Sequence, residues 1–347
     1  MMNKTLRIVA DHDIPYLKGV LEPYAQMRYL KGSDITHEDV RDAQVIITRT
    51  RTRCDRHLLE GSAVQMIATA TIGHDHIDLD YCAQHGIEVA TAAGCNARAV
   101  LQYVMGALTT LARTDGWNPT EKTLGVVGVG NVGSLIYHYG ELFGFRVLGC
   151  DPPKKRENPA LPYLPLEEML PQCDIVTLHT PLIETGPDRT RGMASERFFA
   201  QMKPGSIFIN SSRGPVLEDT ALLQAIQQGI VTRSVIDTWN HEPAINRELL
   251  QSVTFATPHI AGYSRQGKAA GTADVVEAIS RRFSLPLRGW YPSEVDPTRP
   301  DETLSWETLG ETIPAYFNIE RHSNFLKTHP GAFEEWRNHY DYRTEFF

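Results

Sequence analysis

The sequence predicts an α/β protein built on two doubly wound parallel sheets. Two series of short apolar runs alternate with helix-like stretches over residues 6–285, and strands this apolar need a sheet that helices cover on both faces. A glycine-rich loop follows the first strand of the second series, as in nucleotide-binding domains. At 347 residues the chain is about twice the length of a typical domain, which also favours two or three domains.

The first series occupies the first third of the chain. Its expected strands are rich in β-branched or apolar residues and span 6–10, 44–50, 65–70 and 87–92. Polar helical stretches separate them, and one of these runs from Asp78 to Gln84 and stops at Gly86. A longer helix-like pattern then covers 96–112, with apolar residues at helical spacing at Val100, Val104, Leu108 and Leu111.

The second series resembles the first in pattern, although the sequence contains no evident internal repeat. Its expected strands span 123–130, 145–151, 173–180, 206–212, 233–239 and 254–260, and one more helix is expected at 267–283. The composition then changes, because 286–300 carries four prolines and is typical of a linker. In the aromatic-rich tail, Phe333, Trp336 and Tyr340 share helical spacing, which is usual for a core or an interface.

Composition and charge exclude several classes of protein. Apolar residues make up 41% and charged residues 22%, as in soluble globular proteins. The net charge of −8 argues against a nucleic-acid or membrane-surface partner, although a local basic pocket could still hold a small anion. The five cysteines are scattered, with no C-x-x-C pair, which favours a reducing compartment. No segment approaches the roughly 20 apolar residues that span a bilayer, and none resembles a signal peptide. We therefore expect a cytoplasmic protein.

Three glycines form the pattern G-x-G-x-x-G at Gly128, Gly130 and Gly133. The pattern follows an apolar strand, opens an apparent helix, and precedes the acidic Asp151 by about 20 residues. Such glycines permit a tight turn and let the backbone approach a pyrophosphate, which the helix N-terminus stabilises. Asp151 can accept hydrogen bonds from ribose hydroxyls and would repel a 2′-phosphate, so NAD is favoured over NADP. The basic run at 154–156 weakens that preference.

Arg213, Asp237 and His259 each follow an expected strand of the second series, and Glu242 lies five residues beyond Asp237. In a doubly wound sheet the carboxyl ends of the strands line the ligand crevice. Oxidation of a 2-hydroxy acid by NAD requires removal of the hydroxyl proton, which a histidine can accept near neutral pH. A carboxylate such as Glu242 can orient the imidazole, and Arg213 can bind the substrate carboxylate and polarise the C2 oxygen.

Each of these residues also has a purely structural interpretation. His259 could be a satisfied core residue, Arg213 a surface ion pair and Glu242 a solvated loop acid. Their joint occurrence at the expected strand ends favours an active site for hydride transfer instead.

Three segments resemble the D-isomer-specific 2-hydroxyacid dehydrogenase family, namely NSSRGPVLEDTALLQAI (210–226), VIDTWNHEP (235–243) and TPHIAGYS (257–264). Further motifs, including AAGCNARAVLQYV, VGVGNVG, CDPP and HIAGYSRQGKAAGT, are similar to one branch of that family, whose substrate is a small phosphorylated 2-hydroxy acid. The resemblance implies three regions: a flavodoxin-like substrate-binding domain (1–95 and 263–285), a Rossmann NAD-binding domain (96–262), and a linker with a C-terminal homodimerisation region (286–347).

The resemblance also implies roles for individual residues. Arg213, Glu242 and His259 would be catalytic, with the histidine as the acid/base. Besides the glycine loop, contacts to NAD would come from Asn131, Val132, Asp151, Thr180, Ser211, Ser212, Arg213, Asp237 and Gly262. Contacts to the substrate would come from Thr50, Thr71 and Tyr263, with Thr50 standing where the branch more usually has serine. The tail HPGAFEEWRNHYDYR is similar to the dimerisation region of the branch, but it is shorter.

The stretch TRTRTRCD (48–55) offers a candidate site for the phosphate. If it is extended chain, Arg49, Arg51 and Arg53 share one face, which could bind a phosphate. Arg49 is the best candidate because it adjoins Thr50, although a charged edge strand explains the pattern equally well.

Two polar clusters, DHD (11–13) and GHDHID (73–78), have residue types that bind metals. We nevertheless expect no metal, since hydride transfer to NAD needs none and Asp78 can cap a helix instead.

Two alternative functions remain open. The chain could be another dehydrogenase of the same family, acting on 3-phosphoglycerate, glycerate or D-lactate. It could also be a non-catalytic NAD(H)-sensing protein that recruits partners. Such a protein needs no proton acceptor, so the presence of Arg213, Glu242 and His259 together argues against this alternative.

Overall fold

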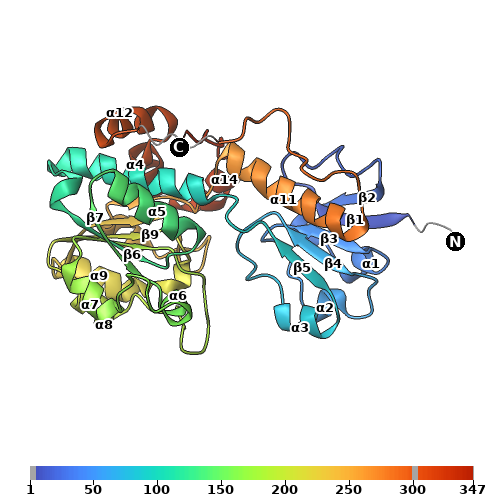
Figure 1. Ribbon diagram of the computed structural model, residues 1–347, viewed down its shortest axis with the longest axis horizontal. Helices are drawn as coiled ribbons and strands as arrows, with labels where there is room; N and C mark the ends of the chain where they lie inside the picture. The colour runs from blue at the N-terminus through green and yellow to red at the C-terminus, as the bar shows by residue number, and fades with distance from the viewer. Residues whose placement is uncertain (1–4, 299–303, 347) are drawn as a thin grey trace. The chain divides into compact units, whose positions relative to one another are not determined.

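The computed structural model describes residues 5–298 and 304–346, which divide into two compact units (Figure 1). Unit 1 contains the described residues of Met1–Asn96 and Ser264–Thr298, and unit 2 those of Ala97–Tyr263 and Arg299–Phe347. Each unit is built around one sheet in which all the strand pairs are parallel. The predicted fold class is therefore confirmed.

Unit 1 has a five-stranded sheet in the order β2-β1-β3-β4-β5. The strands are β1 (Leu6–Asp11), β2 (Ala25–Leu30), β3 (Val45–Thr48), β4 (Met66–Thr69) and β5 (Glu88–Thr91). The helices are α1 (His37–Val40), α2 (Arg56–Leu59), α3 (Leu79–Gln84) and α11 (Arg265–Phe283), with a short 3₁₀ turn η1 (Gly32–Asp34). This strand order is that of flavodoxin-like sheets.

Strand β2 was missing from the prediction. It pairs with β1 and forms the edge of the sheet. Its sequence, AQMRYL, contains no β-branched residue, and its side chains vary between buried and exposed. An edge strand needs less apolar surface than a central one, so it lacks the apolar run by which the other strands were recognised.

Helix α11 returns the chain to unit 1. The Ser264 hydroxyl caps its first turn by accepting a hydrogen bond from the Gly267 N–H at 2.9 Å. Val275, Val276 and Ile279 are buried in the core on one face of the sheet, where α11 contacts β4 and β5 (Figure 1). The predicted helix is thus confirmed, and unit 1 is formed from two distant segments of the chain. The proline-rich segment 286–298, expected to be a linker, belongs to unit 1 as well.

Unit 2 has a six-stranded sheet in the order β11-β10-β9-β8-β6-β7. The strands are β6 (Thr123–Val127), β7 (Arg146–Cys150), β8 (Ile175–Leu178), β9 (Ser206–Asn210), β10 (Val231–Ile236) and β11 (Phe255–Ala256). The α-helices are α4 (Ala97–Asp115), α5 (Asn131–Leu142), α6 (Pro152–Glu157), α7 (Leu166–Met169), α8 (Glu196–Ala200), α9 (Asp219–Gln227), α10 (Arg247–Ser252), α12 (Trp306–Tyr316), α13 (Ile319–Thr328) and α14 (Phe333–Asn338). Short 3₁₀ turns are η2 (Pro119–Glu121), η3 (Leu170–Gln172), η4 (Gly214–Val216) and η5 (Pro330–Ala332).

Alternating side chains of these strands fill two cores, one on each face of the sheet. Leu124 and Val126 of β6 lie in the core shared with α4 and α5, whereas Val127 lies in the opposite core with α8 and α9. Figure 1 shows the two helix layers on the two sides of this sheet. Both faces are therefore covered, as the continuous apolar runs predicted.

The aromatic tail packs into unit 2. Phe333 is buried in the core that contains α8 and α9, and Tyr340 packs against the opposite core. Trp336 stacks on Phe325 with 3.8 Å between ring centroids. These contacts agree with the core interpretation of the aromatic stripe.

The strand order of unit 2 reverses at β6. Strand β7 lies on one side of β6, and β8 lies on the other. In a doubly wound sheet, ligands bind outside the carboxyl ends of the strands at such a reversal. Gly128 directly follows β6 and Thr180 comes two residues after β8, so both residues lie at this point.

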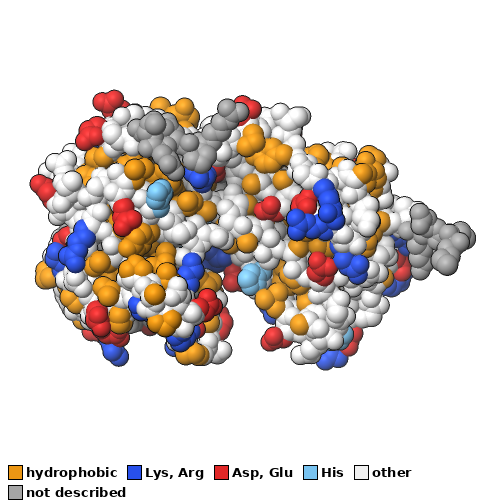
Figure 2. All heavy atoms as spheres, in the orientation of Figure 1, with side chains coloured by type: hydrophobic (Ala, Val, Ile, Leu, Met, Phe, Trp, Pro, Cys, Tyr) orange, Lys and Arg blue, Asp and Glu red, His pale blue; other side chains and the backbone are white. Residues whose placement is uncertain are grey.

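Within the described residues, no helix has both the length and the apolar character that crossing a bilayer requires. On the face drawn in Figure 2, basic side chains are interspersed with acidic ones. All five cysteines lie in the described part of the chain and none takes part in a disulfide.

Candidate active site

The glycine loop joins β6 to α5 in a tight turn. Gly128 has a φ of +84°, and a Cβ placed there would lie 2.7 Å from the carbonyl oxygen of His179. A Cβ at Gly133 would lie 1.9 Å from the carbonyl oxygen of Gly128, so the first turn of α5 touches the loop directly. A Cβ at Gly130 would have no atom within 4 Å. There is thus open space before Asn131 and Val132, where the helix N-terminus favours an anion.

Asp151 ties the end of β7 to the glycine loop. Its carboxylate accepts hydrogen bonds from the Val129 N–H at 2.9 Å and from the Lys154 N–H at 3.1 Å, and the second of these caps α6. The Lys154 ammonium donates to the Val129 carbonyl. The carboxylate therefore lies beside the loop, where the ribose of a dinucleotide on this type of turn would be.

Two buried hydroxyls beyond the carboxyl ends of β8 and β9 have no hydrogen-bond partner, namely Thr180 Oγ1 and Ser211 Oγ. An unsatisfied buried hydroxyl costs about 1–3 kcal/mol, and a ligand bound at this edge of the sheet can supply the missing partners. The glycine loop and these hydroxyls fit a bound dinucleotide, which can supply both the pyrophosphate and the missing partners.

Gly133→Ala is expected to destabilise unit 2 and abolish NAD binding, because its methyl group overlaps the Gly128 carbonyl. Gly130→Ala is the matched control, since its methyl group has room in the protein but occupies the space before α5. It should melt like the wild type and bind NAD at least about tenfold more weakly, or ~1.4 kcal/mol. Thermal unfolding and fluorescence titration with NAD measure both effects. A Gly133→Ala protein that melts and binds NAD like the wild type would contradict this description of the loop.

The turn after β9 positions Arg213. The buried Asn210 accepts hydrogen bonds from the N–H and the hydroxyl of Ser212 at 3.1 and 2.8 Å, and it donates to the Arg213 carbonyl at 3.2 Å. The Arg213 side chain is half-buried, and its Nη1 donates to the Ser212 carbonyl at 2.9 Å. A Cβ at Gly214 would lie 1.9 Å from the carbonyl oxygen of Trp239, so this turn is packed directly on the turn that follows β10.

Asp237, fully buried at the end of β10, holds the segment that carries His259. Its carboxylate accepts hydrogen bonds from the Thr257 hydroxyl at 2.6 Å, the Ile260 N–H at 2.8 Å and the Ala261 N–H at 2.9 Å. Its carbonyl accepts the His259 N–H at 2.8 Å. Burial raises the pKa of Asp237, and the charge of His259 and these hydrogen bonds only partly oppose the rise. Gly262 follows directly in the same turn.

His259 and Glu242 form a hydrogen-bonded pair. The imidazole Nδ1 lies 2.8 Å from Glu242 Oε2 and 3.1 Å from Oε1, and Oε1 also accepts the Trp239 N–H at 2.9 Å. Burial acts to raise the pKa of Glu242, but the charge and hydrogen bond of His259, the Arg337 guanidinium and the Trp239 N–H together bring it below its usual value. An ionised Glu242 favours the proton on Nδ1, which gives Nε2 the role of exchanging a proton.

His259 also has an unusual backbone conformation. Its φ is +57°, in the left-handed region that residues other than glycine seldom adopt, and its side chain is 31% exposed. Strain of this kind is characteristic of functional sites. The side chain is therefore neither a core residue nor fully solvated.

The candidate substrate residues Thr50 and Thr71 lie in unit 1. They follow β3 and β4, two neighbouring parallel strands. The Thr71 hydroxyl hydrogen-bonds the Thr69 hydroxyl at 2.8 Å and donates to the Gly73 carbonyl at 3.0 Å.

The extended arginine-rich strand considered from the sequence is not present. Strand β3 ends at Thr48, and the chain bends over 50–52. The alternation of Arg49, Arg51 and Arg53 therefore does not place them on one face of a strand, because the regular pleat has ended.

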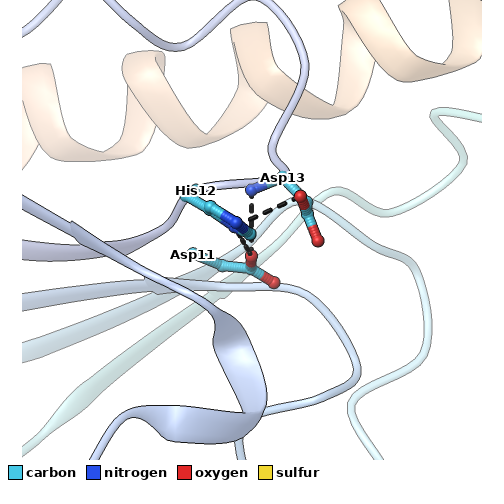
Figure 3. A group of neighbouring side chains, drawn as sticks. All are labelled: Asp11, His12 and Asp13. Carbon is cyan, nitrogen blue, oxygen red and sulfur yellow. Dashed lines mark hydrogen bonds and ion pairs between the residues drawn. The ribbon is translucent and has the colours of Figure 1, made fainter.

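Asp11, His12 and Asp13 form a compact polar group in unit 1, with potential ligand atoms within 4.8 Å of one another (Figure 3). His12 Nδ1 lies 3.7 Å from Asp11 Oδ1 and 3.2 Å from Asp13 Oδ1. The Arg49 guanidinium contacts the other oxygens of the two carboxylates at 3.0 and 2.8 Å. One guanidinium already pairs with both carboxylates, and the absence of a metal stays a prediction.

In the second polar cluster, Asp78 accepts the Tyr81 N–H at 2.9 Å and caps α3, as considered from the sequence. His76 is largely buried, and this burial lowers its pKa to about 4.

Arg337 of α14 lies outside the set of residues for which the sequence predicts a role. Its Nε donates to the Tyr263 hydroxyl at 3.1 Å, and its Nη1 lies 3.6 Å from Glu242 Oε2. The nearest sequence signal was the aromatic stripe of the tail, because Arg337 directly follows Trp336. The stripe predicted packing, but not the residue that the packing would place against Glu242.

Comparison with known proteins identifies the family. Residues 96–261 match the family model described as D-isomer specific 2-hydroxyacid dehydrogenase, NAD binding domain. An erythronate-4-phosphate dehydrogenase of Bacteroides thetaiotaomicron is 44% identical over 342 residues, which cover 98% of this chain and 97% of the relative. The erythronate-4-phosphate dehydrogenase of Cronobacter sakazakii is 37% identical over 98% of this chain and 92% of the relative.

Solved structures agree on the fold. The D-lactate dehydrogenase from Aquifex aeolicus, complexed with NAD and lactic acid, matches with a TM-score of 0.65 over 80% of this chain and 95% of that one, at 23% identity. The family model that matches residues 96–261 describes the NAD-binding domain. Together with the full-length similarity to the relatives, this shows that the chain belongs to the D-isomer specific 2-hydroxyacid dehydrogenase family.

Proposed function

We propose that the chain oxidises 4-phospho-D-erythronate at C2 with NAD, giving 3-hydroxy-2-oxo-4-phosphooxybutanoate in the synthesis of pyridoxine 5′-phosphate. The names of the full-length relatives support this choice of substrate. The observation that carries the chemistry is the 2.8 Å contact between His259 Nδ1 and Glu242 Oε2 in a unit that also contains the glycine loop.

NAD, held by the glycine loop of unit 2, would supply the acceptor for the hydride that leaves C2 of the substrate. His259 Nε2 takes the proton of the C2 hydroxyl, so that the C2–O bond becomes a carbonyl. Glu242 orients the imidazole and stabilises its protonated form. Arg213 binds the substrate carboxylate and polarises the oxygen on C2. Asp237 fixes the turn that carries His259 and contributes to the position of the nicotinamide.

We assign NAD binding to unit 2. The NAD contacts would come from the glycine loop, Asn131, Val132, Asp151, Thr180, Ser211, Ser212, Arg213, Asp237 and Gly262. The substrate contacts would come from Thr50, Thr71 and Tyr263. Arg49 remains the candidate for the phosphate, and it would then share its charge with the carboxylates of Asp11 and Asp13.

We further propose that the enzyme is a cytoplasmic homodimer that pairs through its C-terminal region, 286–347. The absence of a disulfide among its five described cysteines is in keeping with a reducing compartment.

A substrate panel tests the proposal. NADH formation is measured with 4-phospho-D-erythronate, 3-phospho-D-glycerate, D-glycerate and D-lactate, and the first should have the highest kcat/KM. NADP replaces NAD in a parallel series, where Asp151 should make it the poorer cofactor. A higher kcat/KM for another acid would overturn the choice of substrate. NAD binding without turnover of any acid would favour the sensor alternative.

A further inference from the structure

The guanidinium of Arg337 contacts the candidate catalytic pair of unit 2, His259 and Glu242, on the Glu242 side. Its Nη1 is 3.6 Å from Glu242 Oε2, the same oxygen that lies 2.8 Å from His259 Nδ1. Its Nε donates to the Tyr263 hydroxyl at 3.1 Å, and the Arg337 side chain is only 17% exposed. One cation of the C-terminal segment therefore contacts both a carboxylate and a phenol of the candidate site.

The packing of the tail fixes this cation in place. Phe333 of α14 is buried in the core, and Trp336 stacks on Phe325 of α13. Arg337 belongs to the same helix, α14, as Phe333 and Trp336, so the position of its guanidinium depends on a packed helix rather than on a mobile surface chain.

A second arginine of the tail holds the turn that follows His259. The buried Arg343 donates hydrogen bonds to the Ile260 carbonyl at 3.0 Å, to the Ala99 carbonyl at 2.8 Å and to the Ala261 carbonyl. The C-terminal segment thus supports the backbone around His259 independently of its contact with Glu242.

We propose that Arg337 is a positioning residue of the active site, which holds the Glu242 carboxylate against His259 and the Tyr263 phenol in its orientation. This inference rests on the proposed roles of His259 and Glu242. Arg337 is not itself a catalytic residue, because it contacts the proposed base only through Glu242. The C-terminal segment would then be part of the catalytic machinery as well as a region for dimerisation.

Several ionisable groups of unit 2 surround the pair, and they come from β10 and its turn, the segment after β11, and the tail. These groups are Asp237, Tyr263 and Arg337. Among them, Arg337 is the cation in direct contact with Glu242, and it contributes to the lowered pKa of this carboxyl.

Loss of the Arg337 charge should change the protonation of His259 in a predictable direction. Without the guanidinium, the Glu242 carboxylate attracts the imidazole proton more strongly, so His259 keeps a proton to higher pH. Oxidation needs a neutral His259, so the acidic limb of the kcat/KM profile should move to higher pH in Arg337→Met. Loss of a partly buried charge this close to the pair should shift the limb by about one pH unit. At a pH below the limb, kcat/KM should then fall about tenfold.

The conservative variants separate the two contacts. Arg337→Lys should return the acidic limb most of the way to its wild-type pH, because lysine keeps the positive charge. The return should be incomplete, because lysine lacks the planar fork of the guanidinium. Tyr263→Phe should raise KM for the acid without moving the limb. All three variants should melt close to the wild type. A profile for Arg337→Met that superimposes on the wild-type profile would overturn the proposal, whether or not the variant melts earlier.

A measurement without substrate distinguishes failure of this proposal from failure of the proposed function. NMR titration of histidine ring signals follows His259 directly, and the His259→Asn variant identifies its signal. The midpoint for His259 should be higher in Arg337→Met than in the wild type. That shift in a protein that oxidises no acid would defeat the proposed function and support the role of Arg337. Equal midpoints in an active enzyme would defeat the role of Arg337 alone.

Discussion

His259→Asn is expected to lower kcat for acid oxidation by about 10²–10⁴-fold, the range that a positioned general base contributes. Asparagine is the best replacement because His259 has a φ of +57°, and asparagine adopts this region more readily than most residues. Its amide cannot take up the hydroxyl proton. NAD binding should change little, since the glycine loop and the hydroxyls of Thr180 and Ser211 are untouched.

Glu242→Gln provides the control for this effect. If Glu242 acts through His259, the double variant should be little slower than His259→Asn alone, because residues that act as a unit give non-additive losses. Steady-state kcat and thermal unfolding are measured for the wild type, the two single variants and the double variant. Fully additive losses would separate the two residues, and a His259→Asn enzyme within tenfold of the wild type would remove His259 from the role of base.

Arg213→Met is expected to lower kcat/KM for the acid by about 10²–10³-fold, as for loss of a group that stabilises developing charge on a substrate oxygen. The fold should survive, because Asn210 holds this turn through the Arg213 carbonyl and not through its side chain. Arg213→Lys keeps the charge but loses the planar fork that matches a carboxylate, so it should be intermediate. Initial rates over a range of acid concentrations measure these effects at saturating NAD.

Added guanidinium ion tests the cause of the Arg213→Met defect. It should restore part of the activity of Arg213→Met and none of that of His259→Asn, because it can replace a cation but not a proton acceptor. If Arg213→Met binds and oxidises the acid like the wild type, the carboxylate is bound elsewhere.

The sequence was sufficient to predict that several candidate residues directly follow strands. Asp151, Arg213 and Asp237 each stand within a few residues of the end of an apolar run, and parallel strands bring such positions to one edge of a sheet. The glycine loop could also be predicted from the sequence, because backbone atoms approach its glycines too closely for any other residue to fit. A Cβ at Gly133 would lie only 1.9 Å from the Gly128 carbonyl oxygen.

Other features depend on contacts that no local pattern encodes. Strand β2 was missed because an edge strand can be polar. The arginines after β3 alternate as in a strand, but the strand had already ended at Thr48, and Arg49 bonds to carboxylates brought from β1 and the residues after it. Arg337 lies 95 residues from Glu242 in the sequence, so only the packed tail places them together.

A crystal structure of the enzyme with NAD and the 2-oxo acid product tests the central claim most directly. The account predicts that His259 Nε2 lies about 2.6–3.2 Å from the oxygen on C2, with Glu242 on Nδ1 and the Arg213 guanidinium on the acid's carboxylate. An imidazole turned away from C2, with Arg213 bound to another group while both ligands are in place, would contradict it.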